Sequence, residues 1–144
     1  MKQLTSYNRV AGYLNKLFDL LNGHYFENAL TRPTITIQST PRAYGHFSTR
    51  DDTWVSVTGN SNEINIGAGT LSRPIENVCA TLLHEMCHYY CHVNGIKDTS
   101  RGNTYHNKRF KEIAESHGLI VGHDEKYGWT LTSPSDDLIE FILQ

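Results

Sequence analysis

The chain of 144 residues has the length of one typical domain, which is about 150 residues. It carries 13 Lys and Arg against 15 Asp and Glu, a formal net charge of −2, and 38% of its residues are hydrophobic. This charge balance excludes binding to nucleic acid or anionic lipid through a general surplus of positive charge, and the hydrophobic content excludes a disordered chain. We therefore expect a single domain over residues 1–144 and no membrane partner.

The compartment is predicted from apolar segments and cysteines. No apolar stretch approaches the ~20 residues of a membrane span, and the first segment lacks the uninterrupted apolar core of a secretory signal. The chain has an odd number of cysteines, Cys79, Cys87 and Cys91, and no two of them form a CxxC motif. Both observations argue against a disulfide framework and a zinc ribbon. We expect a cytoplasmic protein.

The first half of the chain has the pattern of a helix followed by short strands. Apolar residues at helical spacing from Tyr7 to Leu21 predict an amphipathic N-terminal helix that begins near Thr5 or Ser6 and ends before Gly23. Alternating runs separated by turn residues then predict a small, mainly antiparallel sheet arranged as a meander. Its expected strands are residues 34–39, 44–48, 53–58 and 63–66.

The second half is predicted to be mostly helical, which makes the fold class α+β. A central helix begins around Pro74 and is stopped by Gly95. A third helix is expected over residues 105–117, a hairpin over 119–131, and a last short helix capped by Ser135. One stripe of the central helix is apolar and is expected in the core: Val78, Cys79, Leu82, Met86, Tyr89 and Val93.

The other side of the central helix carries an HExxH motif, His84-Glu85-Met86-Cys87-His88. The two histidines lie one helical turn apart, so both rings can bind one zinc ion at ~2.0–2.1 Å. Glu85 lies about 100° around the helix from His84, so we expect it to activate a zinc-bound water and not to bind the ion. The motif therefore predicts peptide hydrolysis by a zinc-bound water.

A catalytic zinc site needs a third protein ligand and keeps one position open. The metzincin pattern is excluded, because Cys91 and Asn94 stand where it requires Gly and His. A glutamate ligand would have to be Glu112 or Glu115, and both are predicted on the solvent-facing side of the third helix. The third ligand is therefore expected to be a histidine.

His106 is the favoured third ligand. It lies eighteen residues after His88, at the start of the third helix and on its apolar face, and the intervening loop is long enough to return to the metal. His117 is the alternative donor, but it lies three turns further along and is too distant to share the same ion. The remaining positions are expected on the surface or in the core: His24, His46, His92 and His123 on the surface, and Cys91 in the core.

Together these motifs resemble the SprT-like family of zinc metallopeptidases, which includes bacterial SprT and the DNA–protein crosslink protease Spartan. The resemblance runs from about Leu14 to Leu119 and includes the segments LFDLLNGHYFENAL, EINIGAGTL and TLLHEMCH. The segment from His106 to Phe110 is similar to the family's HGxxF, with Asn107 in place of Gly. The resemblance implies a zincin-like fold, Zn²⁺ held by His84, His88 and His106, and Glu85 as the catalytic residue.

Two features differ from the better-known members. Residues 119–144 contain no cysteine, so we expect no C-terminal zinc ribbon. The basic residues of the third helix are interleaved with acidic ones, which predicts a solvated face of mixed charge. We therefore expect a protein or peptide substrate, and DNA is a candidate partner with little support in the sequence.

The sequence thus predicts a zinc endopeptidase, with DNA-associated or crosslinked proteins as candidate substrates. An extended substrate is expected to pair with an edge strand such as residues 63–66. Two alternatives stay open. One is a zinc-stabilised, non-catalytic binding module associated with nucleic acid, in which Cys91 supplies a fourth ligand; the other is a metal-free scaffold with incidental histidines.

Overall fold

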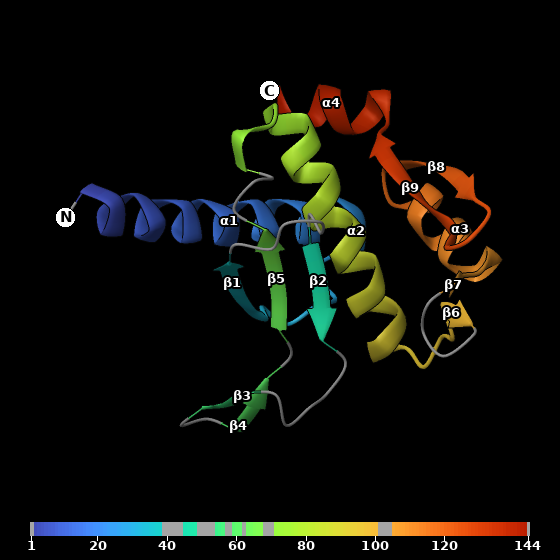
Figure 1. Cartoon of the computed structure of the whole chain (residues 1–144), viewed down its shortest axis with the longest axis horizontal. Coiled ribbons are helices and arrows are strands. Elements are labelled where there is room, and N and C mark those ends of the chain that lie inside the picture. Colours follow the sequence, from blue (N-terminus) through green and yellow to red (C-terminus); the bar gives the residue numbers. More distant parts are fainter. Residues whose placement is uncertain are drawn as a thin grey trace. The chain divides into compact units, whose positions relative to one another are not determined.

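A computed structural model describes residues 2–38, 45–48, 54–56, 59–61, 63–67, 71–100 and 105–143 (Figure 1). The chain divides into two units, Met1–Ser72 and Arg73–Gln144. Within the described ranges there are four helices and several small sheets, which confirms the α+β class. No helix in these ranges is both long and apolar enough to cross a bilayer.

The first unit begins with α1, Lys2–Phe26, which is longer at both ends than predicted. Its side chains Leu14, Phe18 and Leu21 recur at helical spacing and are buried, as expected. The helix continues through Gly23, although glycine costs about 1 kcal/mol within a helix. The added turn places Phe26 in a buried position, and the gain from burying this large apolar side chain offsets the cost of the glycine.

The first unit also contains a three-stranded sheet that is not a meander. Strand β5, Glu63–Gly67, lies between β1, Thr34–Gln38, and β2, Gly45–Ser48 (Figure 1). It runs parallel to β1 and antiparallel to β2, while β3, Trp54–Ser56, pairs with β4, Gly59–Ser61, in a separate ribbon. Ile64, Asn65 and Ile66 are all buried, so both faces of β5 are covered, which is typical of a central strand.

This order overturns one prediction. Residues 63–66 were expected to form a free edge on which an extended substrate could add a strand. Because β5 is hydrogen-bonded to a neighbour on each side, it has no edge to offer.

The second unit is built around α2, Ile75–Val93. Pro74 occupies the N-cap position, and the helix ends before Gly95, whose φ of +67° is the left-handed conformation that glycine adopts readily. The expected apolar stripe is buried except for Val93, which lies in the last turn and is 55% exposed. Leu83, Glu85 and Cys87 are buried as well, so most sides of α2 are covered.

The third helix begins later than predicted. Helix α3 is Lys108–Ser116, and it follows two short strands, β6, Thr99–Ser100, and β7, Tyr105–His106. Asn107 is the N-cap, and its side-chain oxygen accepts hydrogen bonds from the backbone N–H groups of Arg109 and Phe110. His106 therefore lies in a strand, and the expectation that the third helix carries it is wrong.

The rest of the unit agrees with the sequence pattern. Strands β8, Leu119–Asp124, and β9, Gly128–Pro134, form the expected antiparallel hairpin, and α4, Asp136–Ile142, is capped by Ser135. The sheet order is β6-β7-β9-β8, and β7 meets β9 in parallel where His106 pairs with Gly128. Helices α2 and α3 both lie against β9.

Candidate metal centre

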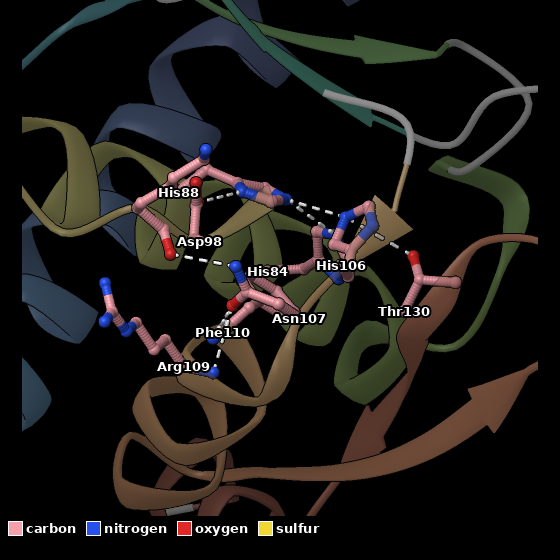
Figure 2. A network of polar contacts seen from close by, with 9 residues as sticks. His84, His88, Asp98, His106, Asn107, Arg109, Phe110 and Thr130 are labelled. Carbon is pink, nitrogen blue, oxygen red and sulfur yellow. Dashed lines mark hydrogen bonds and ion pairs between the residues drawn. The ribbon is translucent and has the colours of Figure 1, made fainter. Parts of the chain in front are cut away.

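Three histidines of the second unit converge on one point. His84 and His88 lie on successive turns of α2, and His106 reaches them from β7 (Figure 2). The Nε2 atom of His88 lies 3.3 Å from Nε2 of His84 and 3.0 Å from Nε2 of His106. The three histidines are positioned to bind a metal ion, with all their ligand atoms within 4.8 Å of one another.

These separations fit a tetrahedral ion. Metal–nitrogen distances of ~2.0–2.1 Å place two imidazole nitrogens about 3.3 Å apart across a tetrahedral edge. The Nδ1 atoms of His84 and His88 contact other groups, so the Nε2 atoms of these two rings are the nitrogens left to bind an ion. The donor set therefore suits zinc, to which imidazole is a common ligand.

The rings are also in the charge state that binds metals. Burial lowers the pKa of His84 well below its usual value, and the neighbouring His88 and His106 lower it further. Burial, followed by the effect of His88, lowers the pKa of His106 from 6.5 to about 4, although the Tyr127 backbone and Asp98 act in the opposite direction. Both imidazoles are therefore neutral at pH 7, the form that ligates a metal.

Two of the three rings are held by groups outside the cluster. Nδ1 of His88 lies 2.6 Å from a carboxylate oxygen of Asp98, and Nδ1 of His84 lies 2.9 Å from the hydroxyl of Thr132. A carboxylate only accepts, so Nδ1 of His88 carries the hydrogen, and Nε2 is the nitrogen left to bind an ion. Neither partner was predictable from the sequence, because Asp98 lies in an irregular loop and Thr132 is 48 residues from His84.

His106 is held mainly by its backbone and by Phe110. Its backbone N–H donates to the carbonyl of Tyr127 at 2.8 Å, while its buried Nδ1 atom has no hydrogen-bond partner within the described ranges. The Phe110 ring packs edge-on against His106 and is stacked on His88. The hydroxyl of Thr130 lies 3.5 Å from Nε2 of His106, and this neighbour too was not predicted.

Glycine is required where β9 passes β7. Gly128 has φ of +79°, and a Cβ atom built on it would lie 2.3 Å from the carbonyl oxygen of His106. It would also lie 2.9 Å from the Tyr105 ring. The close approach that seats His106 therefore depends on the absence of a side chain at residue 128.

Glu85 is buried beside the cluster without belonging to it. Its side chain is on α2 next to His84, and the residue is 6% exposed. Burial raises the pKa of Glu85 to about 7, His88 lowers it, and Asp98 raises it. A carboxyl group with this pKa exchanges a proton readily near neutral pH.

The other candidates lie elsewhere. His24, His92 and His123 are exposed, His117 is not part of the cluster, and the side chain of His46 falls outside the described part of the chain. The three cysteines are buried and free, and burial raises the pKa of Cys91 to about 12. Cys91 is also absent from the metal cluster, so it offers neither an activated thiol nor a fourth ligand in this arrangement.

The fold and site define an α+β protein with a three-histidine metal-binding site. The sequence model of the SprT-like family matches residues 14–126, a range that includes all of α2 and His106. The chain belongs to the SprT-like family, and the resemblance found from the motifs is confirmed. Searches of the curated proteins and of the solved structures returned no match to the chain.

We predict that Gly128→Ala disrupts the metal centre. The added methyl group would collide with the His106 carbonyl, so β7 or β9 must shift and His106 moves with it. We expect a drop of at least tenfold in zinc affinity, measured by competition with a chromophoric chelator. Gly122→Ala in β8, where a Cβ atom would find its nearest contact at 3.4 Å, is the control; an unchanged affinity in Gly128→Ala would contradict the prediction.

We also predict that the metal-free protein loses stability in acid through these imidazoles. The unfolded chain takes up protons on His106 near pH 6.5, whereas the folded chain resists until about pH 4. The free energy of unfolding therefore falls as the pH falls through this range, by up to about 1.4 kcal/mol per pH unit for each such imidazole. Urea unfolding of chelator-treated protein at pH 7, 6 and 5 should show a steeper decline than in His106→Gln; equal slopes would refute the assignment.

Proposed function

We propose that the chain is a single zincin-like domain that acts as a zinc-dependent endopeptidase. His84, His88 and His106 would hold Zn²⁺, and Glu85 would be the catalytic residue. The observation that carries the proposal is the convergence of three imidazole rings near the buried side chain of Glu85, which lies on the same helix as His84 and His88. Membership of the SprT-like family supports the same reading.

The proposed chemistry divides between the ion and the chain. Bound zinc would supply a Lewis acid, which lowers the pKa of a coordinated water and polarises the substrate carbonyl. Glu85 would accept a proton from the attacking water and return it to the leaving amine. Burial raises the pKa of Glu85 above that of an exposed glutamate, which makes its carboxylate a stronger base.

Two hydroxyl groups of β9 lie beside the rings of the histidine cluster. Thr130 and Thr132 are two residues apart on this strand, so their side chains share one face, and each hydroxyl lies within 3.5 Å of a ring nitrogen of the cluster. Among the nearby tyrosines, Tyr89 is buried and the Tyr105 hydroxyl lies 3.0 Å from a ring nitrogen of His123. We therefore favour Thr130 over these tyrosines as a hydrogen-bond donor near the reacting carbonyl.

The proposed substrate is a protein or peptide, and the proposed compartment is the cytoplasm. DNA-associated or crosslinked proteins remain candidate targets. Lys111 and Glu115 form an i, i+4 ion pair on α3, which supports the interpretation of this surface as a solvated face of mixed charge.

A non-catalytic zinc module is the alternative function. A structural zinc site is closed by four protein ligands, whereas the part of the chain that the structure describes brings three together. A zinc ion with three protein ligands keeps one coordination position for water or substrate. The number of ligands therefore favours the zinc endopeptidase over the non-catalytic module.

We predict that Glu85→Gln abolishes proteolysis while zinc is retained. The amide keeps the size of the side chain but accepts no proton, and general acid–base groups typically contribute 10²–10⁴-fold to the rate. Cleavage of fluorescently labelled casein by the zinc-loaded protein should fall by at least 100-fold. Glu112→Gln on the exposed face of α3 is the matched control; proteolysis that survives Glu85→Gln with zinc bound would exclude the general-base role.

We predict that the purified protein holds one zinc ion per chain and that His106→Ala weakens binding by at least 100-fold. Removing one of three ligands leaves an incomplete coordination sphere. Elemental analysis gives the stoichiometry, and chelator competition gives the affinity. His92→Ala on the exposed side of α2 should bind like the wild type; a wild-type protein without zinc would favour the metal-free scaffold.

A further inference from the structure

Asn107 connects two segments that each touch a metal-binding histidine. It follows His106 directly, and its side-chain oxygen caps α3 (Figure 2). The opposite end of the same amide donates to the backbone carbonyl of Lys97 at 2.9 Å and to the hydroxyl of Ser100 at 3.4 Å. The backbone N–H of Asn107 donates to the carbonyl of Asp98 at 3.0 Å. One residue thus ties residues 97–100, which end in the two residues of β6 and are called the loop 97–100 below, to the start of α3.

The loop 97–100 carries the carboxylate that orients His88. The side chain of Asp98 lies 2.6 Å from Nδ1 of His88, and both groups are largely buried. The loop comes shortly after the C-terminal turn of α2. Lys97, which precedes Asp98 in this loop, is exposed. Contacts with Asn107 on both sides of Asp98 therefore hold the backbone from which the carboxylate reaches His88.

We propose that Asn107 is a positioning residue of the metal centre, acting through Asp98 on His88. Asn107 follows His106 directly and is hydrogen-bonded to the loop 97–100. It therefore keeps the α2 ligands in position relative to the β7 ligand. This inference rests on the metal-binding part of the proposed function and is independent of catalysis. Partners that orient a ligating histidine typically change metal affinity 10- to 100-fold.

A helix cap alone would be a simpler role for Asn107, and two substitutions separate the roles. Serine caps a helix about as well as asparagine, but its short side chain has no amide to reach Lys97 and Ser100. Asn107→Ser should therefore keep α3 and lose the link. Asp98→Asn removes the charged acceptor from His88 and leaves the loop in place.

The experiment is a zinc affinity measurement on the full chain by competition with a chromophoric chelator. We expect Asp98→Asn to weaken binding about 10- to 100-fold. Asn107→Ser should weaken it about three- to tenfold, the range expected for the loss of neutral hydrogen bonds. The Co²⁺-loaded variants should also show altered visible absorption, which reports ligand geometry and does not respond to a loss of stability alone.

Asn94→Ser is the matched control. The Asn94 side chain also donates to a backbone carbonyl, that of Tyr90, but it lies at the end of α2 and does not join the loop to α3. It should leave zinc affinity and the Co²⁺ spectrum unchanged. Urea unfolding of each metal-free variant shows whether the fold is intact.

The double variant tests the route through Asp98. If Asn107 acts by placing Asp98, adding Asn107→Ser to Asp98→Asn should cost little more than Asp98→Asn alone. Fully additive losses would overturn the proposed route, and wild-type zinc affinity in Asn107→Ser would reduce Asn107 to a helix cap. If the wild-type chain binds no zinc, both this inference and the proposed function are overturned. If the wild type binds zinc and Asn107→Ser binds it equally well, only this inference is overturned and the proposed function stands.

Discussion

The second unit depends on holding three imidazole rings close together, with Nε2 of His88 3.3 Å from Nε2 of His84 and 3.0 Å from Nε2 of His106. Placing three rings so closely requires that each ring be held in orientation by its surroundings. The surrounding structure holds the cluster by independent means: helical spacing for His84 and His88, a strand pairing for His106, and an aromatic ring, Phe110, packed against all three. Binding of one metal ion by all three rings would stabilise the unit.

The three ligands are not held alike. A carboxylate orients His88 and a hydroxyl group lies beside His84, whereas His106 relies on its backbone and on the glycine opposite it. The position of His106 is therefore sensitive to changes in β7 and β9 that never touch the ring. Asn107 adjoins this ligand and also supports the loop that orients His88, so disturbance at one residue reaches both sides of the site.

Much of the architecture was predictable because it depends on local periodicity and capping. The extent of α2, the buried face of α3, the β8–β9 hairpin and the Ser135 cap all follow from residues close together in the chain. The errors share a different cause. The position of β5 between β1 and β2, and the placement of His106 in a strand, depend on pairings with residues distant in sequence, which apolar patterning does not specify.

The sequence by itself determined the candidate ligands and the family, since an HExxH motif places two histidines on one helical face whatever surrounds the helix. Only the tertiary structure decided how His106 reaches them and which groups orient the rings. Asp98, Thr132 and Gly128 acquire their roles through contacts made across loops and between strands. Such contacts depend on close packing in three dimensions, and no spacing along the chain encodes them.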